Sequence, residues 1–243
     1  MLVGGALGAI VIASAASIPA VRVRVAKVLR PRVTVEQQVG LYGPGARSRL
    51  GPVFASAGVA YPPARVAFLV FKAERRLDLY AGAREGAGGW AFVRSYPVLA
   101  ASGRLGPKLR EGDRQVPEGV YRIESLNPNS LYHLSLRVGY PSAFDRLRGR
   151  EDGRSELGGN IMIHGGAASI GCLAMGDPAV EELFVLAADV GIERLEVVMC
   201  PADWRREGIA VETDGMPGWV PGLYELLRGR LNDFPARDAA GRP

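Results

Sequence analysis

The sequence predicts a mainly β domain with few helices, of the sandwich or barrel type, preceded by an N-terminal apolar helix. Three observations carry this prediction. Short runs rich in β-branched and aromatic residues recur between residues 65 and 200, and turns rich in Gly and Pro separate them. Only one segment in that region has clear helical periodicity with end signals. Residues 1–21 carry no charge at all.

The uncharged segment 1–21 has about the length, roughly 20 residues, that a helix needs to span a bilayer. Small residues around Ala15 also suit a cleaved secretory signal, so we expect a signal peptide or a membrane anchor. Basic residues follow the segment instead of preceding it, which by the positive-inside rule places the C-terminal side in the cytoplasm. An export signal has its basic residues first, so we expect a basic stretch upstream of the printed start. We interpret 22–63 as a basic segment and linker with at most one short helix.

Residues 65–81 read RVAFLVFKAERRLDLYA and predict two strands around a polar turn near Glu74 and Arg75. In the second strand, Leu77 and Leu79 alternate with polar residues. Further strands are expected in the segments 90–101, 119–126, 132–140, 160–164 and 193–200.

A helix is expected to begin at Asp177, a good N-cap, with Pro178 in its first turn, and to end at Gly191. Its apolar stripe consists of Val180, Leu183, Phe184 and Ala187. A second helix is expected over 222–231, within a helical extension that we assign to 201–243. The domain between these terminal parts is assigned to 64–200.

The chain carries a net charge of +5, almost entirely from arginine. Arginine forks suit carboxylates and phosphates, so acidic ligands are plausible, although an ordinary charged surface is the simpler interpretation. Outside residues 22–32 no basic cluster is interleaved with aromatic residues, so we expect no nucleic-acid partner.

The stretch IMIHGGAASIGCLAMGD, residues 161–177, contains one of two histidines and one of two cysteines. His164 could remove the proton of the Cys172 thiol and later return it to a leaving amine. Gly171 would allow substrate to approach the backbone and could expose N–H groups as an oxyanion hole. On spacing alone, a buried inert cysteine and a core histidine are more common.

A zinc site is a further alternative, with His133, His164, Cys172 and Cys200 as ligands. The sequence lacks the closely paired ligand spacings of structural zinc sites, so we expect no metal, and no organic cofactor. Cys200 is interpreted as a buried strand cysteine.

The elements IMIHGG and SIGCLAM together resemble the active-site region of the L,D-transpeptidase (YkuD) catalytic domain family, and within it the YafK-like branch. The segments GPKLREGDRQVPEGVYRI (106–123) and NPNSLYHLSLRVGYPSAFDR (127–146) are similar to that branch in the same order. The resemblance covers residues 64–200, with a weaker match in the tail.

This resemblance implies a YkuD-like β domain that acts on peptidoglycan stem peptides in the bacterial envelope. It implies that Cys172 is the nucleophile that forms a thioester and that His164 is the general base and acid. The Gly165 carbonyl would orient the imidazole, and Ser169 and Gly171 would flank the nucleophile. Ile170 stands where the wider family often has histidine, which leaves the usual cross-linking activity open.

His133, Lys108 and Arg137 are secondary candidates for holding the substrate's carboxylates. Each has a simpler alternative. His133 could be a strand histidine that is hydrogen-bonded to the backbone, and Lys108 and Arg137 could be ordinary surface charges.

We therefore expect a periplasmic, exported or anchored cysteine acyltransferase of cell-wall biogenesis. Its partners would be stem peptides, an envelope lipoprotein, and the inner membrane through residues 1–21. The alternatives are a hydrolase that cleaves the lipoprotein–peptidoglycan amide, a non-catalytic peptidoglycan-binding module, and a cytoplasmic cysteine enzyme. Transfer and hydrolysis would both proceed through the same thioester.

Overall fold

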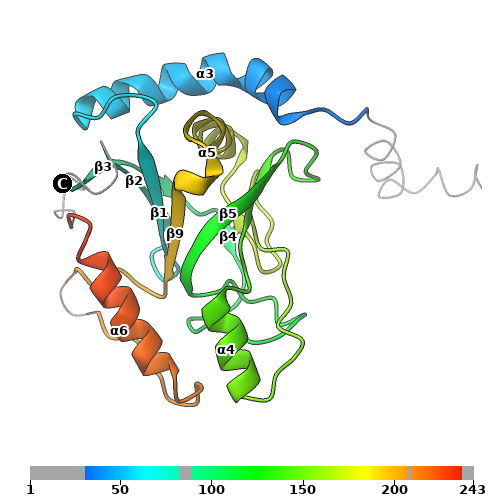
Figure 1. Cartoon of the computed structure of the whole chain (residues 1–243), viewed down its shortest axis with the longest axis vertical. Coiled ribbons are helices and arrows are strands. Elements are labelled where there is room, and N and C mark those ends of the chain that lie inside the picture. The colour runs from blue at the N-terminus through cyan, green and yellow to red at the C-terminus, as the bar shows by residue number, and fades with distance from the viewer. Residues whose placement is uncertain (1–30, 83–88, 207–208, 237–243) are drawn as a thin grey trace, which may run out of the picture. The chain divides into compact units, whose positions relative to one another are not determined.

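A computed structural model of the chain describes residues 31–82, 89–206 and 209–236. The chain divides into two units, Met1–Val33 and Thr34–Pro243, and the elements below all belong to the second (Figure 1). The apolar helix expected over 1–21 lies outside the described residues. Among the helices that are described, none is long and apolar enough to cross a membrane.

The described strands form one mixed sheet in the order β3-β2-β1-β9-β5-β6-β7-β8-β4. Their bounds are β1 Arg65–Phe71, β2 Arg76–Gly82, β3 Trp90–Pro97, β4 Ala100–Ala101, β5 Gly119–Asn127, β6 Ser135–Val138, β7 Met162–His164, β8 Leu173–Ala174 and β9 Leu195–Cys200. The first half of β5 pairs with β9 and its second half with β6, so this strand joins the two parts of the sheet. The mainly β prediction is confirmed, as one continuous half-barrel and not as two sheets packed face to face.

The central strand β1 is buried on both faces, which explains its unbroken hydrophobic run. Val66, Phe68 and Val70 belong to the core that includes α5 (Asp177–Val190). The alternate residues of the strand belong to the core that includes α6 (Val220–Leu231). The helix expected over 222–231 therefore covers the second face of the sheet.

Two helices differ from the prediction: one is longer than expected, and the other was not expected. The segment 22–63 contains not a short helix but α3, a 22-residue helix from Val35 to Ser56, which packs against α5 (Figure 1). Its hydrophobic stripe is sparse and two prolines lie within it, so periodicity gave little signal. The nine-residue α4 (Ala143–Glu151) is mostly polar, and only the capping box between Ser142 and Asp145 marks its start.

Glu182 fastens α3 and the sheet to α5. Its buried carboxylate accepts hydrogen bonds from Arg49 of α3 at 2.6 Å and from Arg94 and Tyr96 of β3 at 2.8 Å each. A buried carboxylate with three donors keeps its charge satisfied, so α5 is held in place from two sides.

We predict that Glu182→Ala lowers the free energy of unfolding by about 2–3 kcal/mol, because Tyr96 loses its buried partner while both arginines remain partly in water. Chemical denaturation measures this value. Arg47→Ala is the matched control: it breaks the more exposed pair with Asp189, and about 1 kcal/mol or less is expected. Equal losses in the two variants would contradict this role of Glu182.

Candidate active site

The parallel pairing of β7 with β8 sets the strand that ends at His164 beside the strand that follows Cys172. His164 pairs in register with Ala174, and Cys172 lies two residues before Ala174. Cys172 lies in the bend directly before β8, and an extended backbone through it would place its side chain on the face of His164, because side chains alternate along a strand. Parallel strands usually need a connection of about a dozen residues or more, whereas only residues 165–172 connect these two.

Glycines make this short connection feasible. A Cβ at Gly165 would lie 2.4 Å from Asp177 Oδ1 and 2.8 Å from the Tyr132 carbonyl, so only glycine fits. Gly171, directly before the cysteine, has a φ of +96°, in the region that favours glycine.

The imidazole of His164 is buried and held in one tautomer. Its Nδ1 lies 2.6 Å from the Gly165 carbonyl. A carbonyl can only accept, so Nδ1 carries the proton and Nε2 is left as the basic nitrogen. Burial lowers the pKa of His164, which is therefore neutral at pH 7. The ring of Tyr132 packs on the imidazole with 4.7 Å between ring centroids.

Asp177 has a different role from the helix cap that the sequence predicted. It is the first residue of α5, and Gly176 occupies the N-cap position without a side-chain bond. The Asp177 Oδ1 instead accepts the Gly166 N–H at 2.8 Å. This bond fixes the turn whose Gly165 carbonyl orients His164. Asp177 comes close to the histidine only in the folded chain, so the sequence pattern did not reveal this role.

The Cys172 thiol is neutral at rest. Its Sγ donates to the Asn160 carbonyl at 3.6 Å. Burial raises the pKa of Cys172, and a hydrogen bond with the backbone of Met162 and the positive charge of Lys108 oppose this only in part.

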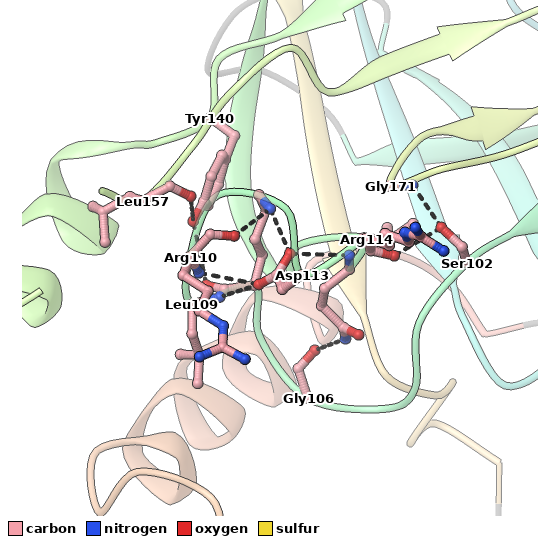
Figure 2. Close-up of polar contacts among 12 residues, drawn as sticks. Ser102, Gly106, Leu109, Arg110, Asp113, Arg114, Tyr140, Leu157 and Gly171 are labelled. Carbon is pink, nitrogen blue, oxygen red and sulfur yellow. Dashed lines mark hydrogen bonds and ion pairs between the residues drawn. The ribbon is translucent and has the colours of Figure 1, made fainter. Parts of the chain in front are cut away.

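Two serine hydroxyls hold the backbone around the cysteine. Ser169 Oγ accepts the Cys172 N–H at 3.2 Å and donates to the Cys172 carbonyl at 2.6 Å. Ser102 Oγ accepts the Gly171 N–H at 2.5 Å and donates to the Arg114 carbonyl at 2.7 Å (Figure 2). The Gly171 and Cys172 N–H groups, candidates for an oxyanion hole, are thus satisfied by hydroxyls in this structure. Ser102 escaped the sequence analysis because it lies 69 residues before Gly171.

Lys108, predicted to bind substrate, is buried in the loop that precedes β5. Its Nζ lies 2.5 Å from Asp113 Oδ1. Asp113 also accepts the backbone N–H groups of Leu109, Arg110 and Gln115 (Figure 2). Lys108 thus fixes its own loop, and its charge still acts on Cys172.

The other two secondary candidates have protein partners. His133 Nε2 lies 3.0 Å from Glu181 Oε1 on α5, and its ring packs edge-on against Tyr42 of α3. Arg137 pairs with Glu124 at 3.1 Å on the surface. Their roles toward substrate stay predictions.

The second cysteine is separate from this site. Cys200 is buried on β9, as expected, and it is a free cysteine whose pKa burial raises well above the ordinary value. Across residues 31–82, 89–206 and 209–236, no three His, Cys, Asp or Glu side chains are grouped to hold a metal ion.

Comparison with known proteins gives matches in sequence and in fold. The family model of the L,D-transpeptidase catalytic domain (YkuD) matches residues 65–197. The protein named "Putative L,D-transpeptidase YafK" of Escherichia coli strain K12 is 41% identical over 117 residues, which make up 47% of this chain and 44% of that protein. The match thus spans less than half the length of this curated relative.

Two solved structures align with the chain at low similarity. The helical cell shape determining protein Pgp2 from Campylobacter jejuni aligns with a TM-score of 0.46 and 22% identity, over 57% of this chain and 48% of that chain. Bd1075 of Bdellovibrio bacteriovorus aligns with a TM-score of 0.40 and 18% identity, over 59% of this chain and 50% of that chain.

We predict that alkylation of Cys172 by iodoacetamide speeds up as pH rises, with a midpoint above the ordinary cysteine pKa. Only the thiolate reacts, and burial raises the pKa of this thiol while the neutral His164 offers no positive charge to stabilise it. Mass spectrometry of labelled peptides follows the rate, and buried Cys200 should label only in denaturant. A midpoint below neutral pH would reveal a resting thiolate–imidazolium pair and contradict this prediction.

We predict that Ser102→Ala speeds amide hydrogen exchange at Gly171 and Cys172 by about tenfold, because one hydrogen bond that holds this backbone is lost. Exchange mass spectrometry of the peptide around Cys172 measures the effect. Ser102→Thr keeps the hydroxyl and should stay close to the wild type. Unchanged exchange in Ser102→Ala would show that this bond does not hold the loop.

Proposed function

The chain belongs to the L,D-transpeptidase catalytic domain (YkuD) family, and from this premise we propose that it catalyses cysteine-dependent acyl transfer on peptidoglycan stem peptides. The observation that supports this most directly is the pairing of β7, which ends at His164, with β8, which begins directly after Cys172. The Gly165 carbonyl on Nδ1 leaves Nε2 available as the base.

The proposed reaction proceeds in two halves. His164 Nε2 takes the proton from Cys172 Sγ as the sulfur attacks the carbonyl carbon of a stem-peptide amide. When the tetrahedral intermediate collapses, the imidazolium gives that proton to the leaving amine, and a thioester remains on Cys172. An incoming amine or water then gives a proton to His164 as it attacks the thioester, and the imidazolium returns that proton to the departing sulfur, which restores the Cys172 thiol.

The charged forms of Cys172 and His164, the thiolate and the imidazolium, require stabilisation during the proposed reaction. Burial disfavours both the thiolate and the imidazolium, so the transfer of the proton between them is uphill at rest. The positive charge of Lys108 favours the thiolate. We assign Lys108 this electrostatic role in addition to its bond with Asp113.

The acceptor decides between two activities of the same site. An amine acceptor gives transpeptidation, and water gives a hydrolase, for which the amide between an envelope lipoprotein and peptidoglycan is the proposed substrate. Ile170, two residues before Cys172, is 72% exposed and offers an apolar contact to whichever acceptor enters. The proposed location is the cell envelope, reached through residues 1–21 and the inner membrane.

The test uses purified sacculi that carry attached lipoprotein. The protein is incubated with them beside Cys172→Ala and the matched control Cys200→Ala, and muropeptides are analysed by mass spectrometry. We expect products with the wild type and with Cys200→Ala, and none with Cys172→Ala, because only Cys172 can form the thioester.

The products also separate the alternatives. New 3–3 cross-links or exchanged stem termini identify a transpeptidase, and loss of lipoprotein-derived muropeptides without new links identifies a hydrolase. Identical products with the wild type and Cys172→Ala would contradict a catalytic role and favour a peptidoglycan-binding module.

A further inference from the structure

The residues 132–134, which lie between β5 and β6, form one wall around the candidate base. The ring of Tyr132 packs on the imidazole of His164, although Tyr132 itself is 46% exposed. The backbone of the same residues lies against Gly165. The Gly165 N–H donates to the Leu134 carbonyl at 3.2 Å, and a Cβ on Gly165 would lie 3.0 Å from the Cβ of His133. The conformation of 132–134 therefore affects two groups that contact the imidazole, the Tyr132 ring and the Gly165 carbonyl.

The backbone of His133 adopts a conformation that needs support. Its φ is +70°, in the left-handed region that residues with a side chain rarely adopt. Such a conformation persists where surrounding contacts hold it. Here the side chain of His133 supplies them, because Nε2 lies 3.0 Å from Glu181 Oε1 of α5 and the ring packs edge-on against Tyr42 of α3. The His133 and Glu181 side chains are only 22% and 19% exposed, so water competes weakly for this hydrogen bond.

Two carboxylates on one face of α5 hold the surroundings of the candidate base. Asp177 and Glu181 lie four residues apart on this helix, so their side chains are neighbours on its surface. Asp177 accepts the Gly166 N–H, and Glu181 binds His133. The second oxygen of Glu181 accepts a hydrogen bond from Arg49 of α3 at 3.3 Å, so this carboxylate is itself oriented. A single helix thus fixes both the turn after the base and the segment that packs on the base.

We propose that His133 and Glu181 are positioning residues for His164. Their hydrogen bond holds the segment 132–134 so that the Tyr132 ring and the Gly165 carbonyl keep the imidazole of His164 in its Nδ1–H tautomer. This gives His133 a role within the protein in place of the substrate contact expected from the sequence. The importance of the pair for acyl transfer rests on the proposed function, whereas the orientation of His164 does not.

The test is nuclear magnetic resonance of the full chain with ¹⁵N-labelled histidine at pH 7. The chain has two histidines, so two imidazoles give signals, and His133→Asn assigns the remaining one to His164. We expect one tautomer of His164 in the wild type, with the proton on Nδ1. In Glu181→Ala the Nε2–H tautomer should rise to about a tenth of the population or more, because the loss of one net hydrogen bond changes such an equilibrium about two- to tenfold.

Two further variants separate positioning from a general loss of structure. Glu181→Gln keeps an acceptor oxygen for His133 and should restore the wild-type tautomer. The matched control is Asp189→Ala, which removes another carboxylate of α5. Asp189 also binds an arginine of α3, Arg47, and a ring, the hydroxyl of Tyr61, but it lies two turns farther along the helix. The tautomer of His164 should be unchanged in this control.

Melting curves identify the variants that fold. If Glu181→Ala does not fold, His133→Asn takes its place, because it removes the same hydrogen bond and asparagine tolerates a positive φ. A single Nδ1–H tautomer in the folded variant, or an equal change in Asp189→Ala, would overturn the proposal. On sacculi, the maximal rate should fall with Glu181→Ala and recover with Glu181→Gln. A wild type without activity on sacculi, together with the expected tautomer shifts, would remove the acyl transfer and leave this positioning role standing.

Discussion

The parallel pairing of β7 with β8 across residues 165–172 is the constraint on which the candidate site depends. The connection between two adjacent parallel strands must run from the C-terminal end of the first back to the N-terminal end of the second. Here that connection is very short. The geometry forces close approaches that only glycine permits, as at Gly165, and a positive φ directly before the nucleophile at Gly171. The glycines that surround the histidine and the cysteine are therefore a requirement of the connection. The same connection begins directly after His164 and ends in Cys172, so the proposed chemistry depends on the conformation that the fold requires of this connection.

A short loop in this conformation needs support from outside, and a chain of polar contacts supplies it. The buried pair of Lys72 and Glu118, 2.9 Å apart, anchors the segment before β5 to the sheet. Ser102 extends the support to the Gly171 N–H, and Tyr224 of α6 also bonds to Glu118. A buried ion pair adds little net stability because both charges lose water, but it tolerates few alternative arrangements. We infer that it contributes order more than stability, and that α6 thereby contributes to the same support from the far face of the sheet.

The parts of this structure that sequence could predict are those that local pattern determines. The strands β1 and β2 and the helix α5 follow from alternation, turn residues and an apolar stripe, and the resemblance in 161–177 pointed to His164 and Cys172. The parts that escaped depend on contacts between distant segments. Asp177 has the residue type of a cap but bonds to Gly166, and Ser102 has no motif of its own. The helix α3 packs on α5 and pairs with it through Arg49 and Glu182, contacts that a sparse stripe with two prolines does not predict.

The electrostatics of the pair indicate how a buried cysteine could be both stable and reactive. Burial raises the pKa of Cys172 and lowers that of His164, so both groups are neutral when no substrate is bound. A neutral thiol reacts slowly with oxidants and stray electrophiles, which suits the envelope location proposed for this chain. In the proposed reaction, the proton transfer becomes favourable only when the attack on the carbonyl consumes the thiolate as it forms. The reactivity of Cys172 would thus depend on a correctly placed amide, with Nε2 of His164 already oriented by the Gly165 carbonyl to receive the proton.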